Sequence, residues 1–282
     1  MADIPDIRLH LIAYDEASRA LCEPGYTVLD NQANERPDWR EYWPMRRFLL
    51  SERLDEQAWY GFFSPKFASK TGLSHAQTRS FIEQAAPTSD VVCFSPQFDM
   101  GAFFLNVFEQ ADTFDPGFLA ATQQWLSQAG WQVNLSKLVM DSRQVVFSNF
   151  FVARPAFWRE WLHWNEQLFA VCEGPDSALR RSLVAPTMYD GYLHPHAVQR
   201  KVFLMERIAS LLLATQPQWR TTPHNPMRFA WSDSRLSRFP AEALVCDALK
   251  MALRDRGWSE YLGAFGSMRK RFLETQDSRK AA

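Results

Sequence analysis

The sequence has few of the features that mark membrane, secreted or zinc-binding proteins. Its 282 residues contain no run of 18 or more apolar residues, so no transmembrane helix is expected. Acidic residues stand near the start of the chain, where a signal peptide needs basic ones, and this predicts a cytoplasmic protein. The four cysteines are widely spaced and form no C-x-x-C pair. We therefore expect buried, reduced thiols instead of disulfides or a zinc site.

Neither sign of charge is in excess. The chain has 31 Lys and Arg against 32 Asp and Glu, a formal net charge of -1. Nucleic-acid binders usually carry a strong basic excess, so nucleic acid is not expected as a partner. Aromatic residues, in contrast, make up 14% of the chain, including 11 Trp. Such rings either fill a bulky core or offer flat surfaces on which sugars and bases stack.

Several strong catalytic motifs are missing. The sequence contains no G-x-G-x-x-G fingerprint, no P-loop, no G-x-S-x-G elbow and no H-E-x-x-H. The only close histidine pair, His194 and His196, is separated by Pro195 and has no third ligand nearby. No metal site is predicted there.

Short apolar runs alternate with segments of helical spacing, which predicts an α/β fold with a largely parallel sheet. Strands are expected at 8–14, 26–29, 58–63, 90–94, 137–140 and 145–153. Helices are expected at 40–53, 75–84, 101–111, 117–129, 155–172 and 198–215, and two more close the chain. The S-x-x-Q capping box at Ser74 begins the second of these helices. We expect one α/β domain over residues 1–215 and a loop-rich, helical extension over 216–282.

Polar residues follow four of the predicted strands. Open α/β sheets bind ligands beyond the carboxyl ends of their strands, so these residues are candidates for ligand contacts. They are Asp15, Asn31, the pair Lys66 and Lys70, and Asp99. The two lysines could act as point charges on a diphosphate. The alternative is a set of solvated loop charges.

Glu206 is a further candidate because it lies in an otherwise apolar helical segment, KVFLMERIASLLLA. A carboxylate in such a place is costly unless it is paired or used. Two interpretations stay open: a structural ion pair with a neighbouring arginine, or a carboxylate that faces a cleft as a base or as an acceptor for a sugar hydroxyl.

Four segments occur in an order that resembles bacterial capsule and lipopolysaccharide glycosyltransferases of the GT-A type. They are EYWPMRRFL, WYGFFSPKF, SNFFVARPAFWREWLHWNEQLFAVCE and KVFLMERIASLLLA. Members of that group carry a YW-x-W-K-N helix, a G-x-x-H-Y-R-R strand end, an N-M-F-I strand and a late S-E-R-L-F helix. The matching positions are Tyr42-Trp43, Ser64-Pro65-Lys66, Asn149-Phe150-Phe151-Val152 and Glu206-Arg207.

The resemblance implies a GT-A-like (Rossmann-like) enzyme that transfers a sugar from a nucleotide-sugar to a growing surface glycan. It also implies a cytoplasmic protein and allows peripheral association with the inner face of the membrane through a lipid-linked acceptor. Asp99 or Glu206 would be the general base if the enzyme inverts the sugar configuration. The residues expected to border the nucleotide and its diphosphate are Asp15, Asn31, Lys66, Lys70 and Asn149, with Arg46 and Arg143 in reserve.

Two departures from the group bear on the metal. The His-Tyr-Arg-Arg turn is replaced by Ser-Pro-Lys-Phe, and no D-x-D pair occurs in the sequence. Either isolated acids such as Asp99 or Asp141 hold Mn²⁺ or Mg²⁺, or cationic side chains offset the charge of the leaving diphosphate without a metal.

The hypothesis requires Lys66, Asp99 and Glu206 to share one cleft. Trp43, Trp59 and Phe104 are expected to provide stacking surfaces for sugars. Two other functions stay open: a catalytically silent glycan-binding or scaffold subunit, and a sulfo- or phosphotransferase on the same kind of sheet.

Overall fold

The structure, a computed structural model, describes residues 5–188 and 198–273. A six-stranded sheet forms its centre, in the order β2-β1-β3-β5-β4-β6. The antiparallel strand β5 lies between β3 and β4, whereas the pairs β1-β2, β1-β3 and β4-β6 are parallel. The predicted α/β class is therefore confirmed, with a mixed, mostly parallel sheet. The strands are β1 Ile7–Ala13, β2 Thr27–Asp30, β3 Trp59–Phe63, β4 Val91–Cys93, β5 Phe151–Ala153 and β6 Thr221–Pro223.

The central strands are apolar along their whole length because both faces of the sheet are covered. Successive residues of a strand point to opposite faces. In β3, Phe62 belongs to the larger buried cluster, while its neighbour Phe63 belongs to a second one. Val91 and Val92 of β4 divide between the two clusters in the same way.

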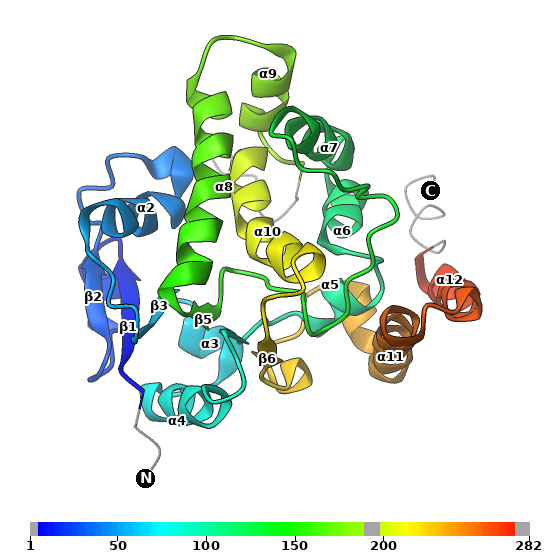
Figure 1. The fold of residues 1–282 in the computed structure, drawn as a ribbon, viewed down its shortest axis with the longest axis horizontal. Coiled ribbons are helices and arrows are strands. Elements are labelled where there is room, and N and C mark those ends of the chain that lie inside the picture. The colour runs from blue at the N-terminus through cyan, green and yellow to red at the C-terminus, as the bar shows by residue number, and fades with distance from the viewer. Residues whose placement is uncertain (1–4, 189–197, 274–282) are drawn as a thin grey trace.

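Three long helices cover the face of the larger cluster: α2 (Tyr42–Ser51), α8 (Pro155–Glu173) and α10 (Arg200–Thr215) (Figure 1). Helix α4 (His75–Ala85) covers the other face, and the capping box predicted at Ser74 is present at its start. The remaining helices are α1 Glu16–Ala20, α3 Phe67–Thr71, α5 Phe98–Ala102, α6 Val107–Phe114, α7 Phe118–Gln128, α9 Ala178–Val184, α11 Pro240–Arg256 and α12 Ser259–Leu273, with short 3-10 turns at Pro37–Trp39, Pro226–Arg228 and Arg235–Arg238.

Some boundaries differ from the sequence predictions. The expected strand at 137–140 is absent, and of 145–153 only the last three residues pair in the sheet. The preceding backbone bonds to side chains instead: Val146 donates to the Ser210 hydroxyl at 2.8 Å and Phe147 to the Ser95 hydroxyl at 3.0 Å. The helix expected at 101–111 is split by Asn106, whose side chain caps the start of α6.

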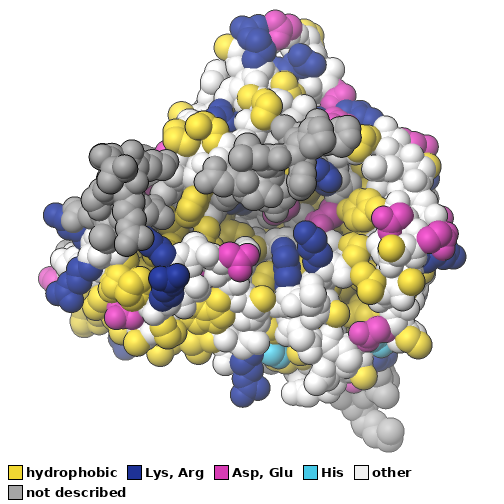
Figure 2. Space-filling model, turned by 180° about the vertical axis from the view of Figure 1, so that it is seen from behind, with side chains coloured by type: hydrophobic (Ala, Val, Ile, Leu, Met, Phe, Trp, Pro, Cys, Tyr) yellow, Lys and Arg dark blue, Asp and Glu magenta, His cyan; other side chains and the backbone are white. Residues whose placement is uncertain are grey.

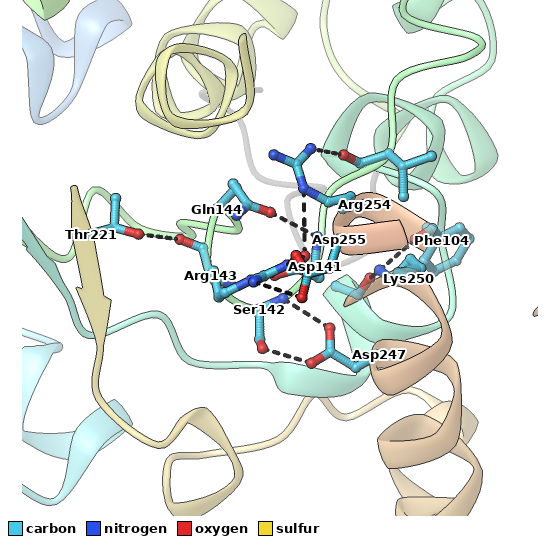
Figure 3. A network of polar contacts seen from close by, with 12 residues as sticks. Phe104, Asp141, Ser142, Arg143, Gln144, Thr221, Asp247, Lys250, Arg254 and Asp255 are labelled. Carbon is cyan, nitrogen blue, oxygen red and sulfur yellow. Dashed lines mark hydrogen bonds and ion pairs between the residues drawn. The ribbon is translucent and has the colours of Figure 1, made fainter. Parts of the chain in front are cut away.

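The chain beyond residue 215 is tied into the same structure. Strand β6 extends the sheet beside β4, α11 packs against α5, and α12 packs against α11. Lys250 of α11 is fully buried, and its ammonium group donates to the carbonyls of Gly101 at 2.6 Å and Phe104 at 2.8 Å. These bonds join α11 to the segment at the end of α5 (Figure 3).

The same network holds the segment that leads to β5. Asp247 of α11 accepts hydrogen bonds from the backbone and hydroxyl of Ser142. The neighbouring Asp141 is fully buried and pairs with Arg143 at 2.8 Å and with Arg254 at 3.5 Å. Figure 3 shows these groups converging from the 141–144 turn and α11. The network therefore fixes the beginning of the 141–150 segment.

Among the helices of residues 5–188 and 198–273, none combines the length and the apolar character that crossing a membrane requires.

Candidate active site

Polar side chains gather at the carboxyl edge of the sheet. Tyr14 follows β1, Asn31 follows β2 and Ser64 follows β3. Because β5 runs in the opposite direction, the residues before it, Ser148 and Asn149, lie at this same edge. Ser148 and Asn149 adopt left-handed backbone conformations, with φ values of 61° and 53°. Left-handed conformations are uncommon for residues other than glycine, and they cluster at active sites and ligand-binding segments.

Glu41 immediately precedes α2 and points to this edge. The side chains of Ser64 and Asn149 lie close enough to its carboxylate to lower its pKa. The group lies deep among protein atoms while part of its surface stays open to solvent. Burial, and then repulsion from Glu206, raises the pKa of Glu41 to about 7. A carboxyl group with this pKa can both take up and release a proton near neutral pH.

Glu206 on α10 is the second carboxylate of the pair. It too is half-buried, and burial raises its pKa. Three groups oppose this shift: the charges of Arg207 and Lys70 and a hydrogen bond from the backbone N–H of Ser148. The phenol of Tyr14 lies within electrostatic reach of both Glu41 and Glu206, and burial raises its pKa well above the ordinary value.

Lys70 supplies the positive charge of this site. It lies near the end of the short helix α3, and its Nζ donates to the Ser148 hydroxyl at 2.8 Å. The ammonium group also lies 5.7 Å from the centre of the Phe150 ring. Its charge lowers the pKa of both Glu41 and Glu206. Two carboxylates and one ammonium group therefore form a single electrostatic unit, which we call the Glu41–Glu206–Lys70 site.

Two buried amides at the same edge of the sheet have unused hydrogen-bonding capacity. Asn31 is 2% exposed, and neither its Nδ2 nor its Oδ1 has a partner among the described residues. Asn149 is 1% exposed; its Nδ2 lies 3.4 Å from the sulfur of Met205, and its Oδ1 has no partner there. Buried polar groups are almost always satisfied, so these atoms indicate that a ligand or water completes them.

The face opposite to that of Figure 1 is hollowed near its middle (Figure 2). Acidic side chains are visible at the floor of the hollow, and basic side chains lie below it.

Of the residues predicted from the sequence, Lys70, Asn149 and Glu206 are brought together, and Asn31 lies at the same edge. Lys66 is exposed and is the residue directly before α3. Asp15 follows β1 as predicted, but its carboxylate caps α1 by accepting from Ser18 at 2.7 Å. The required sharing of one cleft by Lys66, Asp99 and Glu206 is thus not observed.

Asp99, Arg46 and Arg143 have structural partners, which corrects the roles expected for them. Asp99 is fully buried and accepts hydrogen bonds from the backbone and hydroxyl of Ser232. Arg46 forms two hydrogen bonds to Glu166 of α8, at 2.5 and 2.8 Å.

Arg143 lies between Asp141 and Asp255 in the network of Figure 3. Asp141, the other acid expected to hold a metal, is enclosed in the same network. These charges stabilise contacts between elements and are not available to a diphosphate.

The rings expected to stack on sugars are packed against other residues of the protein. Trp59 is fully buried and Phe104 is 1% exposed. Trp43 is half-buried, and its ring packs against Phe169. A bound sugar therefore cannot reach Trp59 or Phe104.

Glu41 is the main residue of the candidate site that sequence reasoning missed. The available signal was its place as the first residue of the segment EYWPMRRFL, directly before the first residue of α2 and after the loop that follows β2. The charge of the neighbouring Arg207 lowers the pKa of Glu206, while its guanidinium also donates to the carbonyls of Val107 and Phe203. Both interpretations of Glu206 therefore stay open.

No group of three or more His, Cys, Asp or Glu side chains suited to a metal ion occurs within residues 5–188 and 198–273. The pair His194 and His196 lies outside the described residues. At the Glu41–Glu206–Lys70 site, two carboxylates share their space with an ammonium group. This donor set fits a divalent cation poorly, because the ammonium charge repels it.

No protein-family model, curated protein or solved structure matches the chain.

Proposed function

We propose that the protein is a glycosyltransferase of GT-A-like fold that moves a sugar from a nucleotide-sugar donor to a glycan acceptor. One observation carries the proposal: Glu41 and Glu206 lie beside Lys70 at the carboxyl edge of a mostly parallel sheet. This edge is where open α/β sheets bind their ligands. The surface-polysaccharide acceptor, of the capsule or lipopolysaccharide type, rests on the sequence resemblance.

In the proposed reaction, a hydroxyl oxygen of the acceptor attacks the anomeric carbon of the donor sugar. The bond from that carbon to the diphosphate oxygen breaks, and the nucleoside diphosphate leaves with the bonding electrons. The Glu41–Glu206 pair takes the hydroxyl proton, since one carboxyl of the pair has a pKa of about 7. The pair thus supplies a base in a partly desolvated place.

The positive charge of Lys70 supports departure of the diphosphate. A fixed cation near a developing anion stabilises the transition state without reorganisation. Lys70 is held by Ser148, whose strained backbone also faces Glu206. Lys70 would therefore supply the positive charge that a divalent cation supplies in D-x-D enzymes. The unpartnered amides of Asn31 and Asn149 are assigned to the nucleotide.

The test is a donor screen with the purified chain. UDP-, GDP-, CMP- and ADP-sugars are offered one at a time, with and without Mn²⁺, and hydrolysis and the melting temperature are measured. A ligand at 100 times its Kd stabilises a protein by about 2.7 kcal/mol. We expect one nucleotide class to raise the melting temperature and its sugar to be hydrolysed, and Glu206→Gln to abolish hydrolysis while leaving the thermal shift.

Other outcomes contradict the proposal. If no donor is hydrolysed or shifts the melting temperature while a glycan binds, the chain is a glycan-binding or scaffold subunit. If a nucleotide binds but only a sulfo or phospho donor reacts, it is another transferase.

A further inference from the structure

Arg40 has a strained backbone conformation directly before Glu41. Its φ of 48° and ψ of -127° lie in a region that glycine adopts far more readily than a residue with a side chain. The preceding residue, Trp39, is fully buried, and its indole N–H donates to Glu173 of α8 at 2.9 Å. A glycine at position 40 would make the same turn with less strain. The turn alone therefore does not account for an arginine here.

The side chain of Arg40 is exposed, and its guanidinium forms no hydrogen bond or ion pair with a residue that the structure describes. Its surroundings differ in this respect. Within residues 35–47, all of which are described, every charged side chain except those of Arg40 and Glu41 belongs to an ion pair. The pairs are Arg36–Asp38, Arg36–Glu173, Arg46–Glu166 and Arg47–Glu35, at 2.5–3.6 Å. Arg40 is thus a cation that an anionic ligand can use without breaking a contact of the fold.

Arg40 lies at the carboxyl edge of the sheet, where the candidate site is. It ends the loop that leads from Asn31, after β2, to Glu41 and α2. Burial raises the pKa of the Tyr14 phenol, the charges of Glu41 and Glu206 add to this shift, and the charge of Arg40 opposes it. The guanidinium and the two carboxylates therefore all act on one buried phenol, which places Arg40 at the border of the site.

The charge balance of the site calls for a second cation. Lys70 faces the carboxylates of Glu41 and Glu206, so the three groups carry a net charge of -1 when both acids are ionised. A nucleoside diphosphate adds further negative charge, which like charges repel. Arginine suits this task because its planar guanidinium can bind two phosphate oxygens at once.

We propose that Arg40 binds the diphosphate of the nucleotide-sugar donor through its guanidinium. The inference rests on the proposed function, since it takes the ligand to be a nucleotide-sugar. Arg40 forms no covalent bond in the reaction and moves no proton. It holds the leaving group, while the Glu41–Glu206 pair takes the proton of the acceptor hydroxyl. The fixed backbone on both sides of Arg40 preorganises the contact, which lowers the entropy lost on binding.

The experiment compares UDP, GDP and ADP with the matching nucleosides uridine, guanosine and adenosine. Isothermal titration calorimetry measures the Kd of each for the full chain, and we expect one diphosphate to bind more tightly than its nucleoside. Arg40→Ala should weaken binding of that diphosphate about 10- to 100-fold, the loss expected for one hydrogen-bonded charge, and leave its nucleoside unaffected. The matched control is Arg53→Ala, which removes an exposed arginine just beyond the other end of α2 and should change neither Kd.

Arg40→Gly separates a role in binding from a role in the fold. It should weaken the diphosphate as much as Arg40→Ala does, yet melt at a higher temperature than Arg40→Ala, because glycine relieves strain that alanine keeps. Diphosphate binding that is unchanged in both variants would overturn the inference. So would an equal loss of nucleoside binding, or a melting temperature of Arg40→Gly below that of Arg40→Ala.

Failure of the inference is distinguishable from failure of the proposed function. If the parent chain hydrolyses a donor of the screen but Arg40→Ala binds its nucleotide equally well, the inference fails and the transferase proposal stands. The same holds if the chain binds CMP and none of the three diphosphates. If it binds none of these nucleotides, both fail.

Discussion

The ammonium group of Lys70 lies 2.8 Å from the hydroxyl of Ser148, the residue whose backbone N–H faces the carboxylate of Glu206. This contact links the cation on α3 to the acid on α10 through one strained residue.

Replacing Lys70 by Met is expected to lower kcat/KM by about 10²- to 10³-fold, the usual cost of removing one electrostatic stabiliser. The loss of charge should also raise the pKa of Glu41 and Glu206 further, because Lys70 lowers both. The pH–rate profile with the donor identified in the screen measures both effects, and its acidic limb should move to higher pH. Lys66→Met is the matched control, since Lys66 is exposed; an equal loss in both variants would remove Lys70 from the site.

Glu41→Gln should abolish transfer yet stabilise the fold at high pH. The folded pKa of about 7 lies above the unfolded value of 4.5, so the native protein binds more protons between these pH values. Its stability therefore falls as pH rises from about 4.5 to 7. Gln carries no charge, so the variant should gain melting temperature over the parent above pH 7 and gain nothing at pH 4. A gain on the order of 1 kcal/mol corresponds to about 2–4 °C.

Thermal melts at pH 4, 6 and 8 measure this difference. Glu52→Gln, at the exposed end of α2, controls for a general change in net charge. A pH-independent difference between Glu41→Gln and the parent would contradict the burial of an ionised carboxylate.

Asn31→Leu is expected to weaken ligand binding and to stabilise the fold. Both side-chain amide atoms of Asn31 are buried and without a partner among the described residues. An unsatisfied buried polar group costs about 1–3 kcal/mol, which an apolar side chain of similar size avoids. The variant should melt higher and bind the nucleotide about tenfold more weakly, as calorimetry and titration can measure. A lower melting temperature with unchanged binding would argue that Asn31 is satisfied by water and serves the fold.

The two acids that pair with Arg143 should differ sharply in how much each contributes to the free energy of unfolding. Asp141 is fully buried, whereas Asp255 has 53% of its side chain exposed. Removal of a buried partner leaves uncompensated charge and costs about 3–5 kcal/mol, while an exposed pair contributes about 0–1 kcal/mol. Chemical denaturation of Asp141→Ala and Asp255→Ala provides the comparison. Equal losses would contradict the expectation that the buried Asp141 stabilises the network of Figure 3 more than the exposed Asp255 does.

The sequence predicts β1, β3 and β4 well because each is an apolar run closed by polar or turn residues. It does not predict β6, whose three residues, Thr221–Pro223, carry no apolar pattern and include a proline. The run from Val145 to Phe150 has the composition of a strand. Its backbone nevertheless bonds to the hydroxyls of Ser95 and Ser210, which only the folded chain brings near.

The candidate site likewise contains residues that the sequence predicts and a residue that only the folded chain reveals. Lys70 and Glu206 could be selected because each stands out locally, one after a strand and the other in an apolar helix. Glu41 could not, since a charge directly before a helix is ordinary, and its significance depends on contacts with Ser64 and Asn149 far along the chain. The place of Asp99 after β4 predicts a general base, but in the fold its carboxylate accepts hydrogen bonds from Ser232.

Helix α8 contacts both elements that carry the paired acids. Its Glu166 accepts hydrogen bonds from Tyr42 and Arg46 of α2, which begins directly after Glu41, and the same helix packs against α10, which carries Glu206. Helix α8 thus connects the segment that follows Glu41 to the helix that carries Glu206. The spacing of the two carboxylates therefore depends on a helix that supplies neither of them.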